Sequence, residues 1–400
     1  MGLIENLKSY SEGVKISGEK KELFTSFMSK GFPTTKDEEW KYTSLKKIVT
    51  KEYTIENTGE IIDSSTVDKY SLGFENRIIF SDGKLIGSPN IKGVSINGFS
   101  NFGSNTTDSI LQLNKALAQN GFTISVDKNT VLESPIEILF FATTENNFSQ
   151  YRNLISVGDN TEVKFVERIQ TLNDSTSMVN HFTQIHCAKN TKVEYNKIQN
   201  NTPESRLIDT VNVYQEQDST CDINTLIFGG SFTRNNLNFE QNGSNCESNM
   251  NGVSILDDNQ LADNHTFVDH KSAHCRSNEM YKGVYLGNSK GVFNGKIMVR
   301  PDAQKIDALQ SNNNLLLSDN STIDSKPQLE IYADDVKCSH GATTSKIDEQ
   351  ELFYLLSRGI PLRSAEKLIS LGFLDEVIEK ANNEDLIEKV RAIIESKFDS

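Results

Sequence analysis

Two short stretches decide the fold, EVKFVE at residues 162–167 and KVEYNK at residues 192–197. In each, apolar side chains alternate with charged or polar ones, which is the pattern of a β-strand with one buried face. Similar runs of four to nine residues follow one another from about residue 124 to residue 333, and Asn, Asp, Ser and Gly separate them. These residues favour tight turns. Helical periodicity is almost absent from this region, so the sequence predicts one large β unit.

Two architectures fit such a series of strands. One is a β-sandwich, and the other is a β-helix in which each strand pairs with its counterpart in the next coil. No repeat of fixed length is visible, but the region runs for about 200 residues without a helix, which is long for one sandwich. The composition therefore favours the β-helix, and the sandwich stays open as the alternative.

Helical patterns occupy both ends of the chain. Residues 23–28, LFTSFM, have helical spacing, and a second short helix is predicted over residues 36–47. Asp82-Gly83 is a strong signal for a hairpin turn. Asp348 precedes a new helical pattern, and further helices are expected at residues 365–379 and 384–398. We expect an N-terminal helical and mixed domain (1–105), a β core (106–345) and a C-terminal helical domain (346–400).

Charge and composition limit the possible partners and compartment. The 400 residues carry a formal net charge of −14, which disfavours nucleic acid and anionic membranes as partners. No apolar run at the start suits a secretion signal and no 18-residue apolar stretch occurs, so we expect a cytoplasmic protein. The five cysteines include no CxxC pair, which argues against a disulfide framework and against a self-contained zinc site.

Motifs for nucleotide or hydrolase chemistry are missing from the sequence. There is no phosphate-binding loop and no G-x-S-x-G elbow, and the glycines at 283, 287 and 291 are best explained by turns.

Three histidines are concentrated in one short segment. His265, His270 and His274 lie within ten residues, beside Asp263, Asp269 and Cys275. A single metal ion there would require a turn between His265 and His270, because residues five apart on a strand face opposite sides. Hydrogen-bonded histidines in turns are the favoured reading.

The segment KCSHGA, residues 337–342, is a sharper candidate. On a strand, Cys338 and His340 point to the same side and offer a thiolate and an imidazole, which suit iron, iron–sulfur clusters or zinc. Two ligands leave a four-coordinate site incomplete, so such a site would need further ligands from another chain. The residues by themselves favour the alternative of a packed Cys beside a hydrogen-bonded His.

Several longer motifs carry a family resemblance. They are PTTKDEEWKYT at 33–43, YKGVYLGNSKGVFNGKI at 281–297, NLLLS at 314–318, PQLEIYADDVKCSHGAT at 327–343 and LFY with SRGI within 352–360. Together they resemble the SufB/SufD family, and the KCSHGA motif is similar to its SufD branch rather than to its SufB branch. Departures at 305–307 and 344–346 fall in turns beside the motif.

The resemblance implies a mainly β protein with a right-handed parallel β-helix core between helical domains. It implies a non-catalytic scaffold subunit for iron–sulfur cluster assembly that pairs with a SufB-like paralogue, while ATP hydrolysis belongs to a SufC-like ATPase. His340 would face the SufB-like subunit as half of a site for iron or a nascent cluster, with Cys338 as a second ligand or a structural neighbour. The expected SufC-docking residues are Leu352, Phe353, Tyr354, Arg358, Gly359 and Ile360.

Further expectations concern cofactors, assembly and competing functions. We expect the isolated chain to hold no stable cofactor, to carry iron or a cluster only transiently with its SufB-like partner, and to be capable of forming a homodimer. One competing function is a β-helix carbohydrate enzyme, which would normally have an export signal. The other is a metal-storage protein that uses His265, His270 and His274 without partners.

Overall fold

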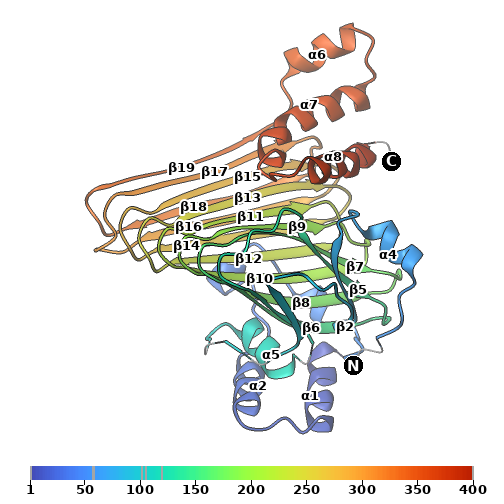
Figure 1. Ribbon diagram of the computed structural model, residues 1–400. Coiled ribbons are helices and arrows are strands. Elements are labelled where there is room, and N and C mark those ends of the chain that lie inside the picture. The colour runs from blue at the N-terminus through green and yellow to red at the C-terminus, as the bar shows by residue number, and fades with distance from the viewer. Residues whose placement is uncertain (1, 56–58, 101, 104–105, 119, 399–400) are drawn as a thin grey trace.

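The computed structural model describes residues 2–55, 59–100, 102–103, 106–118 and 120–398 (Figure 1). The chain is mainly β and forms a parallel β-helix with helices at both ends, which confirms the β-helix and rules out the sandwich. From β4 onward, successive strands alternate between two sheets, so each of these strands pairs in parallel with the strand two positions along the chain, and β1 pairs in parallel with β5. Antiparallel pairing occurs only where β1 meets β2 and β3 meets β4, among the strands of the described residues.

The two sheets are built from strands whose bounds follow in spatial order. The first sheet contains β2 (Lys84–Gly87), β1 (Asn76–Ser81), β5 (Ile136–Ala142), β7 (Glu162–Thr171), β9 (Lys192–Gln199), β11 (Thr220–Ile227), β13 (Glu247–Leu256), β15 (Arg276–Tyr285), β17 (Ile306–Leu316) and β19 (Val336–Ser345). The second contains β3 (Val94–Gly98), β4 (Phe122–Val126), β6 (Phe148–Val157), β8 (Ser177–Cys187), β10 (Ser205–Gln215), β12 (Phe232–Gln241), β14 (Leu261–His270), β16 (Lys290–Val299) and β18 (Thr322–Ile331).

The coils of the β-helix differ in length. Val213 lies beside Phe239, 26 residues later, whereas Ile297 lies beside Leu329, 32 residues later. The sequence therefore contains a structural repeat without a fixed period. The two stretches EVKFVE and KVEYNK are neighbours in this stack, with Glu162 beside Lys192 and Phe165 beside Tyr195.

One corner of the coil has the same backbone conformation in coil after coil. The residue at this corner has a positive φ, which Asn and Asp adopt more easily than most residues. The corner residues are Asn129, Asn160, Asn190, Asp218, Asn245, His274 and Lys305. The Asn- and Asp-rich turns of the sequence thus mark where the chain changes from one sheet to the other.

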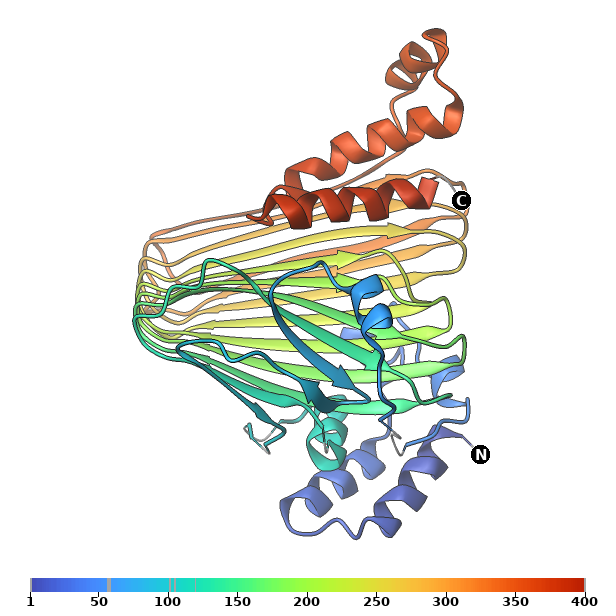
Figure 2. The same ribbon diagram turned by 45° about the vertical axis from the view of Figure 1, so that its right-hand side comes forward.

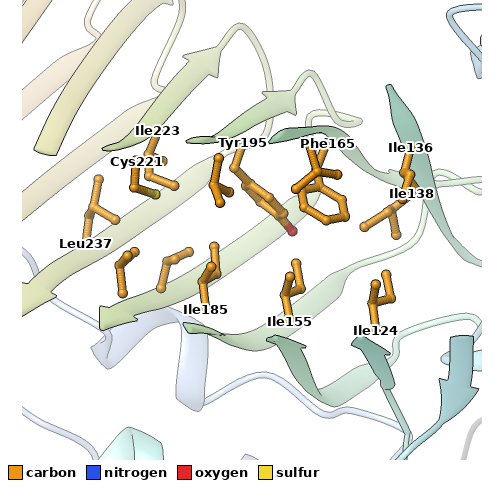
Figure 3. Close-up of a cluster of buried hydrophobic side chains, with 14 of the residues drawn as sticks. Ile124, Ile136, Ile138, Ile155, Phe165, Ile185, Tyr195, Cys221, Ile223 and Leu237 are labelled. Carbon is orange, nitrogen blue, oxygen red and sulfur yellow. The ribbon is translucent and has the colours of Figure 1, made fainter. Parts of the chain in front are cut away.

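Apolar side chains from the two sheets meet inside the coils. Figure 3 shows Ile138, Phe165 and Tyr195 from the first sheet facing Ile155 and Ile185 from the second. These side chains are at most 1% exposed, and burying each is worth roughly 1.5–3 kcal/mol. The central coils therefore form a continuous hydrophobic core along the axis.

The helices are α1 (Leu3–Gly13), α2 (Glu19–Lys30), the 3₁₀ helix η1 (Glu38–Trp40), α3 (Lys46–Val49), α4 (Ser64–Tyr70), α5 (Ser109–Leu117), α6 (Glu349–Ser357), α7 (Leu362–Ile378) and α8 (Glu384–Phe398). Figures 1 and 2 show α1, α2 and α5 at one end of the stack and α6–α8 at the other. The N-terminal helices cover the outer face of the second sheet, where Phe27 and Trp40 cluster with Ile208 and Phe232. Helices α7 and α8 cover the first sheet, and Leu374 and Val390 cluster there with Val253.

The predicted helix over residues 36–47 is wrong. The segment contains only η1 and the start of α3, because its side chains bind the second sheet instead of continuing a helix. Thr43 donates a hydrogen bond to the Asp263 carboxylate over 2.5 Å, and the ring of Trp40 lies 3.9 Å from the Arg234 guanidinium. Two other predicted local features are confirmed: the Asp82-Gly83 hairpin joins β1 to β2, and Asp348 caps α6. Of the three glycines expected in turns, only Gly287 lies in one, whereas Gly283 lies within β15 and Gly291 within β16.

Within the described residues, no helix combines the length and the apolar character needed to cross a membrane.

Candidate functional site

The candidate pair Cys338 and His340 lies on β19, the last strand of the first sheet. β19 pairs with β17 along one edge, and no strand of the described residues covers its other edge. β18 holds the same outermost position in the second sheet. The final coil therefore leaves two strand edges with unpaired backbone groups (Figure 1).

The strand register brings Cys338 and His340 to one face. Cys338 lies beside Ala308 and His340 beside Gln310, and both of these β17 side chains are buried inside the coil. In a parallel β-helix, side chains at equivalent positions of successive coils stack in columns. Cys338 and His340 therefore each end a column of side chains that continues into the interior of the β-helix. Next to His340 the surface of β19 is open, because no atom lies within 4 Å of the position that a Cβ would take on Gly341.

The environments of the two side chains differ. Cys338 is partly buried and packs against a small cluster that includes Ala308 and Ile306. Burial raises the pKa of the Cys338 thiol, and the nearby charge of Asp307 raises it further. His340 is exposed. The imidazole is thus free to meet a partner, whereas the thiol would need a cation or another positive group beside it to ionise near neutral pH.

Beneath His340 the interior of the coil is polar. Gln310 donates a hydrogen bond of 2.9 Å to Glu279 Oε2, and Thr266 donates one of 2.5 Å to the same oxygen. Burial raises the pKa of Glu279 to about 7. In the preceding coil the position of Glu279 is held by Met250. Sequence reasoning missed Glu279 and Gln310, because only the strand register shows that they share a column with His340.

The structure separates the three clustered histidines. His265 and His270 lie on the same strand, β14, with no turn between them. His265 pairs with Asp263 and Glu39 at 2.9 and 3.3 Å, respectively. His270 is buried with Nε2 3.0 Å from the Ser277 hydroxyl, and burial lowers its pKa to about 4. His274 occupies the corner turn. A mononuclear metal site and a storage role built on these three histidines are therefore not supported.

One buried cluster could hold a metal ion by its geometry alone, within the part of the chain that the structure describes. It consists of Glu167, His181 and Asp209 inside the central coils. Lys197 Nζ already lies 2.6 Å from Asp209 Oδ2, and, although burial opposes it, this ammonium group holds the pKa of Asp209 at about 2. The Tyr195 hydroxyl donates to Glu167 over 2.7 Å. The cluster fits a self-neutralised buried network, which sequence reasoning missed because its members come from different coils.

The expected docking residues lie on and just after α6, which has no buried side chain. Phe353 is 72% exposed and Tyr354 is 57% exposed, and Leu352 is partly buried. The Arg358 guanidinium lies 5.2 Å from the Tyr354 ring centre. Gly359 has a φ of 81° and ends the helix, and the Ile360 N–H donates to the Leu355 carbonyl over 3.3 Å.

This surface is an apolar helix hairpin that projects from the stack. Figures 1 and 2 show α6 and the start of α7 extending away from the sheets. Besides Phe353 and Tyr354, the exposed apolar side chains here are Leu356, Leu362 and Leu368. Several exposed apolar side chains on one projecting element are typical of a protein-binding surface.

The chain is also similar in sequence to known proteins. Residues 140–373 match the family described as "SUF system FeS cluster assembly, SufBD core domain", and residues 6–73 match "SufBD protein N-terminal region". The chain is 31% identical to the iron-sulfur cluster assembly protein SufD of Escherichia coli, covering 96% of this chain and 93% of the relative. It is 26% identical to the SufD of Bacillus subtilis, over 71% of this chain and 66% of the relative. An iron-sulfur cluster assembly SufBD family protein of Synechocystis is 26% identical over 87% of this chain and 83% of the relative.

Proposed function

Because the chain belongs to the SufBD family of iron–sulfur cluster assembly proteins, we propose that it acts as a non-catalytic scaffold subunit in the cytoplasm. In this proposal a SufB-like paralogue pairs with its last coil, and a SufC-like ATPase docks on α6 and α7 and supplies ATP hydrolysis. Iron or a nascent cluster is the cargo, held only while the partners are assembled.

The open last coil is the observation that carries the proposal. The free edges of β18 and β19 can accept strands from a related β-helix, and such pairing would cover exposed Ile331 and Tyr332. Cys338 and His340 lie at this end, and a thiolate and an imidazole are iron ligands. A partner that adds its own ligands would complete the coordination that two side chains leave unfinished.

Helix α7 supports a mechanical role for the docking hairpin. Its Phe373 carbonyl accepts a hydrogen bond of 2.8 Å from Lys282 Nζ on β15, and Glu376 pairs with the same ammonium at 2.7 Å. A displacement of α6 and α7 by the ATPase would therefore pull on the sheet two strands before β19. In our proposal this motion opens the paired coils so that iron and sulfide can enter.

Co-purification with SufB-like and SufC-like partners tests the proposal. Phe353→Asp should remove the ATPase from the complex while the paralogue is retained, because a charge replaces an exposed apolar side chain on α6. Val131→Asp is the matched control, since Val131 is 66% exposed but lies near the other end of the stack. Full retention of the ATPase by the Phe353 variant, or loss in the control alone, would contradict the docking site.

A point variant is a better probe than truncation. Deleting everything after Asp348 would also remove Leu374, Val390 and their neighbours from the outer face of the first sheet. The exposed apolar sheet would then aggregate or bind non-specifically, so the loss of the ATPase would have two explanations.

A further inference from the structure

Two cysteines occupy adjacent places in the corner turns of the β-helix. The residue after each corner residue points inward, and in successive coils it is Thr161, Thr191, Ser219, Cys246 and Cys275. These side chains bond to carbonyl groups of their own turns: Thr191 donates to Ala188 over 3.0 Å and Ser219 to Glu216 over 2.6 Å. Cys246 Sγ lies 3.2 Å from the Gly243 carbonyl in the same way. The two thiols therefore stand where hydroxyl groups stand in earlier coils.

The two sulfur atoms face a common point. Cys275 Sγ lies 3.4 Å from the same Gly243 carbonyl oxygen, and the Cys246 N–H donates to Cys275 Sγ over 3.4 Å. The residues that follow them, Glu247 and Arg276, pair in register. Neighbouring strands lie about 4.8 Å apart. A disulfide typically joins Cα atoms about 4.4–6.8 Å apart, so the backbone spacing suits one.

The hydrogen bonding makes the two thiols unequal. The hydrogen bond from the Cys275 thiol lowers the pKa of Cys246, and the Ser219 hydroxyl adds to this effect. The same bond raises the pKa of Cys275. Cys246 is thus the sulfur that ionises first and attacks, and Cys275 is the sulfur that resolves.

Both thiols lie directly beneath the surface of the corner. Each is at most 1% exposed, but each follows an exposed turn residue, Asn245 or His274. A small oxidant needs only a local opening of these turns to reach the sulfur atoms, whereas a protein disulfide is too large to enter. The favoured oxidant is therefore a hydroperoxide.

We propose that Cys246 and Cys275 form a reversible dithiol–disulfide site that hydrogen peroxide oxidises. The Cys246 thiolate attacks one peroxide oxygen, the O–O bond breaks, and a sulfenic acid forms while the departing oxygen leaves as water. Cys275 then attacks the sulfenic sulfur, the S–O bond breaks, and a second water leaves as the S–S bond forms. Two thiols are oxidised and one peroxide is reduced to two waters. A small dithiol reverses the step and is itself oxidised.

The crosslink would join two consecutive coils, β13 to β15, and in the first sheet β15 lies two strands before β19, which carries Cys338 and His340. It closes a loop of the chain and so restricts the unfolded state. We expect the oxidised protein to have a higher Tm than the reduced protein. This site is independent of partner binding and can be tested on the isolated chain.

The test uses the full-length reduced chain treated with a small excess of hydrogen peroxide, quenched, and alkylated in denaturant. Peptide mass spectrometry should find one Cys246–Cys275 crosslink, with the loss of two hydrogen atoms, and dithiothreitol should remove it. Cys338→Ser should leave the crosslink intact. Cys246→Ser should abolish it and still fold, because Ser219 already caps the equivalent turn. The proposal would be overturned if Cys338 is oxidised while Cys246 and Cys275 remain unlinked thiols. It would also be overturned if Cys338 is oxidised while these two cysteines overoxidise without forming the crosslink.

Discussion

Buried Glu279 gives a direct test of how the interior of the terminal coils is built. We consider Glu279→Gln, which removes the ionisable group but keeps its shape. The two donors, Thr266 and Gln310, both bond to Oε2, and an amide oxygen can accept them in the same place. The variant therefore imitates the neutral carboxylic acid.

The magnitude follows from the pKa of this carboxyl, which burial raises from 4.5 to about 7. Between these values the unfolded chain releases the proton and the folded chain keeps it, so wild-type stability falls as the pH rises. Each pKa unit corresponds to about 1.4 kcal/mol, which gives a loss of about 3 kcal/mol that is complete above about pH 7. The Gln variant does not lose this stability.

Urea unfolding of both proteins between pH 4.5 and pH 8 measures the effect. The free energy of unfolding of the variant minus that of the wild type should rise from about zero at pH 4.5 to about 3 kcal/mol at pH 8. Glu145→Gln, at an exposed turn, is the control and should give a flat difference. A flat or falling difference for Glu279→Gln would refute the assignment of a buried, neutral carboxyl at this position.

Two further predictions concern buried ion pairs. Arg234→Ala removes the guanidinium that lies 2.8 Å from the buried Asp263 carboxylate, which keeps Thr43 and His265 as partners, so we expect a loss of up to about 3–5 kcal/mol in urea unfolding and faster proteolysis of the N-terminal segment; an unchanged midpoint would count against the pair. Lys197→Met removes the ammonium group beside buried Asp209, which keeps His181 at 3.2 Å, and should cost up to about 3–5 kcal/mol, whereas Lys192→Met, in an exposed pair, should cost only about 0–1 kcal/mol; equal costs would contradict the account.

The sequence predicted the local structure best where one physical signal dominated. Alternation with a period of two identified the strands, and Asp348 marked the start of α6 because its side chain caps the helix. The repeat was hidden because coil lengths vary between neighbouring turns. The helix expected over 36–47 failed because contacts with a distant sheet, such as that of Thr43 with Asp263, outweighed local propensity.

The candidate site was predictable only in part. Cys338 and His340 share one strand, so their common face followed from the sequence alone. Gln310 and Glu279 belong to other coils, and a shift of one residue in register would have turned them to the outside. Long-range register is set by the packing of the whole stack, which no local pattern encodes.

The central claim is that His340 contributes to a cluster site completed by a partner. The most direct measurement is the iron and acid-labile sulfide content of the complex purified anaerobically with SufB-like and SufC-like partners. His340→Ala should lower both several-fold without loss of either partner, and Ser339→Ala, on the opposite face of β19, should not. Wild-type iron and sulfide in the intact His340→Ala complex would contradict the claim.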